Sequence, residues 1–580
     1  MDRKLSAWAN FSNPMVFPKR WIDPLWGFGL FLAAGLLCII NLGGLPLRDW
    51  DEGIVAQVAR DIWRAPDGSL TWLYPTIAGE PYLNKPPLMH WLVALAYQFG
   101  GVNEWTSRLP GALLTAISVP LLYGIGRELF LRQTPAVLAA LVYMTLLPVA
   151  RHGRLAMLDG GILCLFLLLL FCLLRTRRNL RWGLGVGAAF GLLCLTKGIV
   201  ALLLGAIALT FIYLDTPRLL RSGYVWAGFL LGSLPVFAWY GAQWWRYRNI
   251  FINVTLQSQS LSRIWSSVES NGGPPWYYLL EILKYGLPWL IFLPWGCRLV
   301  WENRSMGWAK LVLVWTIGYL GAISLMSTKL PWYVLPVYPA LALVIGMQLS
   351  QVWNSADFLG IPQSRQGKYP RGWVVLMGLV AIASWVATFY FGGLGTAPQL
   401  DLQLILSVAA LTLTAATILV ACRDSQFIVV LLWGVYLTLM LLMMSRYWVW
   451  ELNEAYPVKP VAEMIQQSLR KQNAPPRQVV ITTYPTFRPS LDFYSDRRVI
   501  PAAQLPPASD SPASTAKKIQ NYWQQTPHPY LLTDPATLKQ LKLEAVQQLG
   551  TAKSWLLVTR AGKSAIPTIH AESSGEKSKG

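Results

Sequence analysis

Long apolar segments recur from residue 25 to residue 446 and restrict the fold more than any other feature of this sequence. Many approach or exceed the ~18 residues that let a helix cross the hydrocarbon core of a bilayer. The chain is 54% hydrophobic and 13% charged, whereas a soluble domain carries about 25% charged residues. We therefore predict a polytopic α-helical membrane protein with about 13 transmembrane helices. The predicted spans are 25–45, 106–127, 133–150, 160–175, 183–196, 198–214, 223–243, 276–297, 307–327, 331–349, 372–391, 403–422 and 426–446.

Basic residues in the loops predict the orientation of these spans. The net charge of +21 would suggest nucleic-acid binding in a soluble protein, but here most Lys and Arg lie in short loops, where they retain a loop in the cytoplasm. With a cytoplasmic N-terminus every second loop is basic, provided that 183–214 forms two spans rather than one long span. The odd number of spans then places the C-terminus outside. The basic loops contain Arg127/Arg132, Arg175/Arg177/Arg178/Arg181, Arg218/Arg221, Arg298/Arg304/Lys310, Arg365/Lys368/Arg371 and Arg423.

The first outer loop, 46–105, has helical patterns of its own. Ile54, Val58 and Ile62 recur at helical spacing, which predicts an amphipathic helix along the membrane surface. The apolar run from Leu88 to Phe99 is too short to span and predicts a second interfacial helix. The stretch 79–87 between them is rich in Gly and Pro and predicts a turn. We assign this loop to a transmembrane catalytic domain of residues 1–450.

Composition becomes more polar after the last span. Apolar runs typical of strands, at Val479–Thr483, Pro529–Leu532 and Trp555–Thr559, alternate with helical stretches at 458–471, 514–525 and 536–548. This alternation predicts a small extracytoplasmic α/β domain over residues 451–561. Residues 562–580 are rich in Ser, Gly and Lys and predict a disordered tail.

Charged residues on the outer side suggest group-transfer chemistry. A carboxylate at a membrane exit, such as Asp51, has the chemistry of a general base acting on an acceptor hydroxyl or phosphate oxygen. Cations hold a phosphate leaving group and offset its developing charge, and Asp159 could orient the acceptor or a basic partner. The candidate phosphate ligands are Lys85, Arg151, Arg154 and Lys329.

Each of these residues also has an ordinary structural interpretation. Asp51 suits the start of a solvated helix, and Asp159 suits an N-cap. Lys85 suits a side chain that snorkels to the interface, and Lys197 a cation at a helix end. Tyr82, Trp332 and Tyr333 suit the aromatic belt at the membrane surface. The residue types alone leave both interpretations open.

Support for a cofactor is weak in the sequence. The chain has four His, and no spacing resembles a zinc site. Asp51, Glu52 and Glu80 have the oxygen ligands of a hard cation, so a divalent metal is possible, with Glu80 as its candidate ligand. No P-loop or Rossmann fingerprint is present, so a nucleotide-linked donor is not indicated.

Several motifs together resemble the aminoarabinose (lipid A) transferase and protein mannosyltransferase branch of the glycosyltransferase C superfamily. The likeness covers about residues 25–350, and residues 484–494 also resemble the C-terminal region of that family. The motifs are Asp51-Glu52 after the first span, Gly79-Glu80-Pro81-Tyr82-Leu83-Asn84-Lys85-Pro86-Pro87, Ser107-Arg108-Leu109-Pro110, Leu195-Thr196-Lys197-Gly198, and Lys329-Leu330-Pro331 with Tyr333 and Pro336-Val337-Tyr338-Pro339.

The resemblance implies the glycosyltransferase C fold and an inverting enzyme of the cell envelope. Such an enzyme transfers a sugar from a polyprenyl phosphate to an extracytoplasmic acceptor, which is a lipid A-like lipid, a glycan or a protein. By position, Asp51 matches the essential acid of the family, Asp159 its second acid and Lys85 its donor-phosphate lysine. The resemblance also implies the plasma (inner) membrane as location and membrane lipids as partners, without nucleic acid.

Further site residues follow from the resemblance. Arg263, in the outer loop 244–275, is expected to reach the donor phosphate. The residues expected to contact substrate are Glu52, Tyr82, Lys197 and Tyr333. Asn84 replaces an acid that aminoarabinose transferases carry before the loop lysine, which argues against a bound metal. An alternative from another class is a transporter or flippase of a lipid-linked saccharide, which would place polar residues deep within the spans.

Overall fold

The computed structural model describes residues 19–77, 79–267, 271–357, 369–395, 397–449, 458–472, 479–505 and 515–561. These residues form two compact units. The first comprises Met1–Leu47, Val58–Thr76 and Pro81–Glu454, and the second Arg48–Gln57, Ile77–Glu80 and Ala455–Gly580, each over its described residues. The tail predicted for 562–580 lies outside the described residues.

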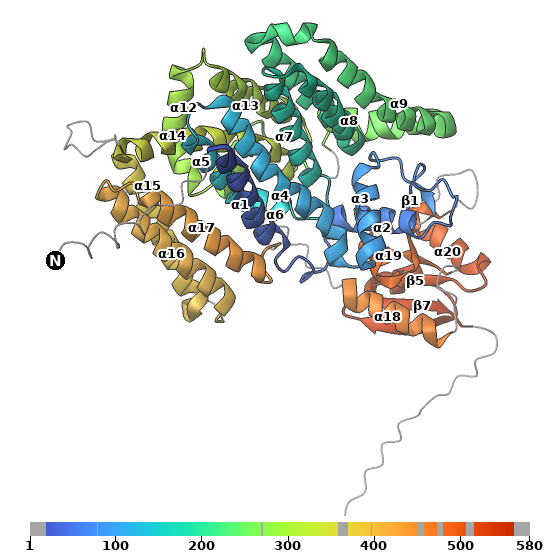
Figure 1. The fold of residues 1–580 in the computed structure, drawn as a ribbon. Helices are drawn as coiled ribbons and strands as arrows, with labels where there is room; N and C mark the ends of the chain where they lie inside the picture. Colours follow the sequence, from blue (N-terminus) through green and yellow to red (C-terminus); the bar gives the residue numbers. More distant parts are fainter. Residues whose placement is uncertain are drawn as a thin grey trace, which may run out of the picture. The chain divides into compact units, whose positions relative to one another are not determined.

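The first unit is a bundle of helices (Figure 1). Ten helices of the described chain are long and apolar enough to cross a membrane. Helices α1, α4, α7, α8 and α9 pack each against the next, and α15, α16 and α17 do the same. The helices are α1 (Lys19–Ile39), α3 (Leu88–Gly100), α4 (Glu104–Leu129), α5 (Thr134–Met144), α6 (Leu147–His152), α7 (Asp159–Thr176), α8 (Gly183–Asp215), α9 (Gly223–Ile252), α10 (Ser262–Trp265), α11 (Tyr277–Tyr285), α12 (Leu293–Glu302), α13 (Gly307–Leu325), α14 (Tyr338–Asp357), α15 (Arg371–Phe389), α16 (Leu400–Ala421) and α17 (Phe427–Met444).

The membrane-protein prediction is confirmed, and the difference between ten and about 13 spans lies in how three segments are built. Segment 133–150 is the two short helices α5 and α6. Segment 276–297 is divided into α11, the short 3₁₀ turn η4 (Trp289–Phe292) and α12, because Pro288 lacks the N–H that would continue a helix. Segment 183–214 carries the single label α8 but consists of two helices that meet at Lys197, where the backbone is not helical (φ −156°, ψ 82°), so the predicted division between 183–196 and 198–214 is confirmed.

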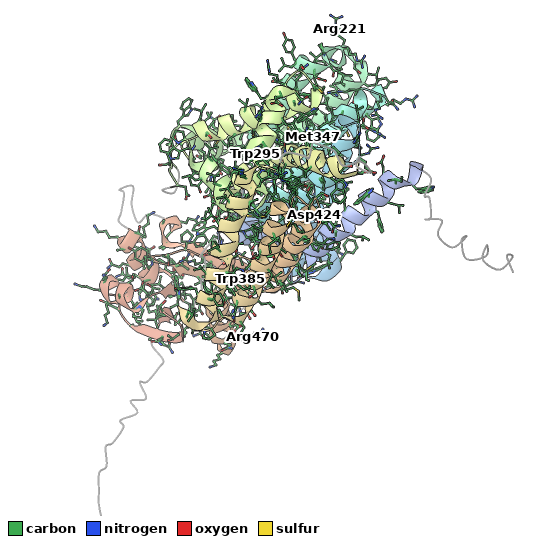
Figure 2. All side chains as sticks on the ribbon, turned by 90° about the vertical axis from the view of Figure 1, so that its left-hand side faces the viewer. Arg221, Trp295, Met347, Trp385, Asp424 and Arg470 are labelled. Carbon is green, nitrogen blue, oxygen red and sulfur yellow. The ribbon has the colours of Figure 1, made fainter. Side chains whose placement is uncertain are left out.

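The loop predicted over 244–275 is largely helical. Helix α9 continues to Ile252 through a kink at Arg248, a π-helical segment η3 (Asn253–Leu261) follows, and α10 ends at Trp265. Arginines interrupt the apolar pattern here, so hydropathy alone ends the helix too early. The basic turn η2 (Pro217–Arg221) joins α8 to α9, and Arg221 projects from the surface there (Figure 2).

Helices occupy both segments of the first outer loop in which the pattern predicted them. Helix α2 (Asp51–Trp63) begins at its two acids, and α3 covers the apolar run after the turn. The turn contains a small hairpin of β1 (Thr76–Ile77) and β2 (Glu80–Pro81). Acids in the first turn of α2 are favoured because they face the positive end of the helix dipole.

The second unit contains a five-stranded mixed sheet of order β4-β3-β5-β7-β6. Strand β3 is parallel to β4 and β5, whereas β7 is antiparallel to β5 and β6. Alternate strand residues point to opposite faces, so Leu532 packs with α18 and α19 while Leu531 packs with α20 and α21. The elements are α18 (Val458–Lys471), β3 (Val480–Thr483), α19 (Ser490–Ser495), β4 (Arg498–Pro501), α20 (Thr515–Gln525), β5 (Tyr530–Thr533), α21 (Pro535–Leu541), β6 (Val546–Ala552) and β7 (Trp555–Arg560), with the 3₁₀ turn η8 (Ala502–Gln504).

The helix predicted over 536–548 is wrong in its second half. Helix α21 ends at Leu541, and β6 begins at Val546. Strand β6 lies at the edge of the sheet with mostly exposed side chains, so it lacks the apolar pattern of a buried strand. Strand β4 was not predicted because only Val499 and Ile500 lie between Arg498 and Pro501, too few apolar residues for a strand pattern.

Candidate active site

A cavity of about 290 Å³ in the first unit collects several of the predicted site residues. Its walls come from α7, α8, α9, η3, α10, α13, the loop before α3, and the 3₁₀ segment η5 (Pro331–Val337). The polar or charged residues that line it are Asn84, Lys85, Asp159, Lys197, Tyr240, Thr255, Gln259, Arg263, Tyr319 and Tyr333. The apolar residues include Ile162, Ile199, Val200, Leu203, Ile323, Leu325 and Met326.

An ion pair joins α7 to α8 at one part of the cavity. Asp159 is the first residue of α7, and its Oδ1 lies 3.4 Å from Nζ of Lys197. The ammonium of Lys197 also lies 5.0 Å from the centre of the Tyr333 ring. Lys197 reaches this position because α8 breaks there. The following Gly198 leaves room for Tyr240, whose Oη would lie 2.4 Å from an added Cβ.

The side chain of Gln259 links Lys85 and Arg263, the other two cationic residues of the lining. Nζ of Lys85 donates to its Oε1 at 3.2 Å, and Nη2 of Arg263 lies 3.5 Å from the same oxygen. Arg263 also donates through Nη1 to Oη of Tyr333 at 3.2 Å. Contacts thus run from Asp159 through Lys197, Tyr333 and Arg263 to Gln259 and Lys85.

The charge in this cavity is not balanced by the residues that line it. Among the lining residues of the described chain, Lys85, Lys197 and Arg263 are cationic and Asp159 alone is acidic. Nε of Arg263 is buried and has no hydrogen-bond partner among the described residues. An excess of positive charge and a buried N–H group that needs a partner are chemically suited to holding an anion.

The structure does not bring Arg151 and Arg154 to the cavity lining. Both are fully buried. Arg151 lies over the ring of Tyr285 at 5.1 Å, and Arg154 lies over the ring of Trp448 at 4.4 Å. Arg154 also donates to the carbonyl of Ile40. These contacts give Arg154 a role in joining the end of α1 to other parts of the helical unit.

Lys329 and Tyr82 also lie outside the lining. Nζ of Lys329 donates to the carbonyls of Ile323 at 3.0 Å and Ser324 at 2.7 Å, so it caps the end of α13. Burial lowers the pKa of Lys329. Tyr82 is buried with its ring 5.3 Å from that of His90. Burial lowers the pKa of His90 to about 4, aided by the nearby Lys85 and opposed by the Pro86 carbonyl.

The predicted site acids Asp51 and Glu52 belong to the second unit. Asp51 is the first residue of α2, and its Oδ2 lies 3.4 Å from Nη1 of Arg48. Glu52 is fully buried and accepts the backbone N–H of Arg48 at 2.8 Å. That contact holds the first turn of α2 and gives Glu52 a structural role.

The surroundings of Glu80 do not fit a metal site. Its carboxylate is exposed and paired with Nη2 of Arg498 at 3.1 Å. No group of three His, Cys, Asp or Glu side chains with the spacing of a metal site occurs in the part of the chain that the structure describes. A guanidinium in place of further oxygen ligands opposes cation binding, so we derive no step through a metal.

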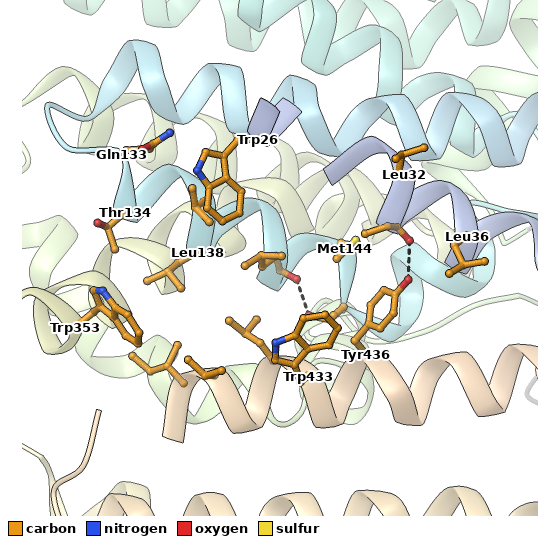
Figure 3. Close-up of a pocket in the computed structure, with 17 residues that line it drawn as sticks. Trp26, Leu32, Leu36, Gln133, Thr134, Leu138, Met144, Trp353, Trp433 and Tyr436 are labelled. Carbon is orange, nitrogen blue, oxygen red and sulfur yellow. Dashed lines mark hydrogen bonds between the residues drawn. The ribbon is translucent and has the colours of Figure 1, made fainter. Parts of the chain in front are cut away.

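A larger cavity of about 690 Å³ lies between α1, α5, α14 and α17 (Figure 3). Its lining is mainly apolar and aromatic, with Trp26, Trp353 and Trp433 among the contributors, and includes no charged residue. Tyr436 donates to the carbonyl of Ala33 at 2.9 Å and joins α17 to α1 beside it. This cavity can accept hydrocarbon but offers no charge to hold a phosphate.

Four polar lining residues were missed from the sequence: Tyr240, Thr255, Gln259 and Tyr319. Tyr240 and Tyr319 lie within apolar helices, where they look like core or belt residues. Gln259 lies in a polar run, Gln257-Ser258-Gln259-Ser260, among apolar neighbours. That run was the available signal, and it was read as part of a loop.

Comparisons with known proteins agree with this architecture. Residues 84–240 match the family described as dolichyl-phosphate-mannose-protein mannosyltransferase. Two curated relatives are undecaprenyl phosphate-α-4-amino-4-deoxy-L-arabinose arabinosyl transferases of Pseudomonas fluorescens. The first is 29% identical over 57% of this chain and 60% of its own length, and the second 30% identical over 63% and 66%. The matches thus span less than two thirds of these relatives.

Solved structures show the same fold. ArnT from Cupriavidus metallidurans, bound to undecaprenyl phosphate, matches with a TM-score of 0.73 at 19% identity, covering 93% of this chain and 99% of that chain. The archaeal oligosaccharyltransferase AglB from Archaeoglobus fulgidus matches with a TM-score of 0.51 at 13% identity, covering 89% and 70%. At these identities the likeness is one of fold.

Proposed function

We propose that this multi-pass membrane protein, which is similar to the aminoarabinose transferase and mannosyltransferase branch of the glycosyltransferase C superfamily, transfers a sugar from a polyprenyl phosphate. The curated relatives are named for undecaprenyl phosphate-linked aminoarabinose. That donor is therefore the first to test. The observation that carries the proposal is the cavity in which three cations and one carboxylate lie beside an apolar wall.

The cavity has the chemistry of a lipid phosphate site. A phosphodiester carries one negative charge, and the monoester that leaves after transfer carries nearly two. Lys85, Lys197 and Arg263 offset both, and the buried Nε of Arg263 supplies a further donor. The apolar residues on α8 and α13 offer a surface for the first isoprene units.

The proposed reaction is one displacement at the sugar. The acceptor oxygen attacks the anomeric carbon and inverts it, while the bond from that carbon to the phosphate oxygen breaks. The phosphate leaves with the bonding electrons, and its charge is stabilised by the cations. We assign the acceptor proton to the carboxylate of Asp51 on the basis of the resemblance. Asp159 holds Lys197 toward the phosphate.

The acceptor and the cellular location are also part of this proposal. A lipid A-like lipid is the acceptor suggested by the resemblance, with a glycan or a protein as alternatives. We place the protein in the plasma (inner) membrane with a cytoplasmic N-terminus. Residues 1–450 then form the catalytic membrane domain, and residues 451–561 the outer α/β domain.

Lipid analysis tests this function. We expect mass spectrometry of the purified protein to detect a polyprenyl phosphate, with or without one sugar. Washed membranes supplied with undecaprenyl phosphate-linked aminoarabinose should then release undecaprenyl phosphate and label a lipid acceptor. Movement of the labelled donor across vesicles without any sugar transfer would contradict the proposal and favour a flippase.

A further inference from the structure

The segment that carries Asp51 folds with the C-terminal part of the chain. Arg48–Gln57 and Ile77–Glu80 belong to the same compact unit as residues 455–580. The contacts responsible join residues as far apart as Asp49 and Ser490, which are 441 positions apart in sequence. The segment that carries the proposed base is therefore held by the α/β domain, through a contact at Asp49, two residues before Asp51.

The central contact is a buried carboxylate with three donors. Oδ1 of Asp49 accepts the backbone N–H of Ser490 at 3.1 Å and also the Ser490 hydroxyl. Its Oδ2 lies 3.3 Å from Nη1 of Arg488. Asp49 is 2% exposed and Ser490 is fully buried. We call Asp49, Arg488 and Ser490 the Asp49 clamp.

Packing on both sides of the clamp leaves little freedom. The ring of Trp50 lies edge-on to that of Phe487, with 5.9 Å between their centres. A Cβ added at Gly53 would lie 3.0 Å from Cβ of Ser490. The first turn of α2 and the start of α19 thus touch without an intervening side chain, and Gly53 permits that approach.

The clamp is connected to Asp51 through Arg48. The backbone N–H of Arg48 is donated to Glu52, and its side chain lies 3.4 Å from Oδ2 of Asp51. Arg48 precedes Asp49 in sequence and Asp51 follows it, and the side chains of Arg48 and Asp51 contact each other. Fixing Asp49 fixes where α2 starts, and so the direction in which the Asp51 carboxylate points.

We propose that the Asp49 clamp positions the Asp51 carboxylate for proton abstraction, so that Arg488 and Ser490 are positioning residues contributed by the C-terminal domain. This inference rests on the proposed function, in which Asp51 is the base. A general base acts only within hydrogen-bond reach of its proton, and a displacement of about 1 Å can cost on the order of 100-fold in rate.

A matched pair of serine variants in the full-length protein tests this role. Ser490→Ala removes a hydroxyl from Asp49, whereas Ser495→Ala removes one that donates to the Leu491 carbonyl in the same helix. Both serines are fully buried. The probe is undecaprenyl phosphate-linked aminoarabinose, with kcat and the donor KM measured separately. Hydrogen exchange of residues 50–57 is followed by mass spectrometry.

We expect Ser490→Ala to lower kcat by roughly 10- to 100-fold, to keep the donor KM within about twofold, and to speed exchange over 50–57. Arg488→Lys, which keeps the charge, should retain more activity than Arg488→Gln. Ser495→Ala should match the wild type in kcat and in exchange over 50–57. A Ser490→Ala protein with normal kcat, or with equal losses in Ser495→Ala, overturns the positioning role. If the wild type transfers no sugar, the proposed function itself fails, so the two failures are distinguishable.

Discussion

Lys85 and Lys329 were both predicted to hold phosphate. In the structure, Lys85 lines the cationic cavity, where its Nζ contacts Gln259. Lys329 instead donates to two carbonyls at the end of α13. The two ammonium groups therefore have different environments, which their residue type alone does not indicate.

Lys→Met substitutions at these two positions should affect different properties, lipid binding for Lys85 and stability for Lys329. Lys85→Met should weaken binding of undecaprenyl phosphate by roughly 10- to 100-fold, because a charge-assisted hydrogen bond contributes about 1.5–3 kcal/mol. Lys329→Met should leave binding within about twofold and lower Tm in detergent, since two carbonyls lose their donor. Native mass spectrometry gives the first quantity and a thermal melt the second. Equal loss of lipid in both variants would contradict this distinction.

The limit of sequence reasoning at this scale is shown by Arg151 and Arg154. Their position after a predicted span suggested a phosphate site. Burial against Tyr285 and Trp448 is a tertiary fact that no local pattern records. Asp159 and Lys197 were both predicted at the site, but their 3.4 Å contact could not be, because the break in α8 sets it.

At the scale of single elements, the break in α8 places Lys197 in the cavity. Gly198 lies against Oη of Tyr240 at this break. Gly198→Ala should therefore destabilise the protein by about 1–3 kcal/mol, because an overpacked site must shift its neighbours. Adding Tyr240→Phe removes the crowded oxygen and should restore most of the lost Tm. A double variant that is no more stable than Gly198→Ala alone would refute this account of the break.

Helix α3 carries a pH-dependent contribution to stability through His90. Burial lowers the pKa of His90 to about 4, while the unfolded chain titrates near 6.5. Between these values the unfolded chain binds the extra proton, so the stability that is present above pH 6.5 declines as pH falls to 4. The decline attributable to His90 is roughly 3 kcal/mol.

His90→Phe keeps a ring beside Tyr82 but does not titrate. We expect the Tm of the wild type in detergent to fall more between pH 7 and pH 4.5 than the Tm of His90→Phe. Other acids titrate in both proteins and cancel in the comparison. Identical pH profiles would show that His90 is not buried in its neutral form.

Elements with long apolar runs or a strong hydropathy period were predicted well. Elements whose structure depends on tertiary contacts were not. The predicted spans are largely helical, because an apolar run of this length has few alternatives to a helix in a membrane. Strand β6 was missed because its residues are exposed, and η3 because π-helical geometry has no hydropathy signal. The boundary near Pro288 depends on local backbone geometry that a hydropathy pattern does not resolve, whereas the predicted division between 183–196 and 198–214 coincides with the break at Lys197.

For the whole molecule, the alternation of basic loops predicts which surfaces face the cytoplasm. In a variant without the exposed Cys297 and Cys422, a cysteine at Asp67 should react with an impermeant maleimide in intact cells. A cysteine at Arg221 should react only after permeabilisation, because its basic turn is expected inside. Labelling of both positions from outside would contradict the predicted orientation.

The association of residues 48–57 with the C-terminal domain could not be predicted from the sequence. The motif at residues 484–494 was recognised by resemblance, but nothing local relates positions 441 residues apart. A buried carboxylate must find donors, which indicates that Asp49 needs partners without indicating which. The fold supplies them in Arg488 and Ser490.

The most direct test of the central claim separates donor binding from sugar transfer at Asp51. Asp51→Asn should bind undecaprenyl phosphate within about twofold of the wild type, while single-turnover transfer falls by on the order of 10²–10⁴-fold, as for loss of a general base. Asp61→Asn, the same substitution later in α2, is the control and should transfer normally. Transfer at the wild-type rate by Asp51→Asn would contradict the account.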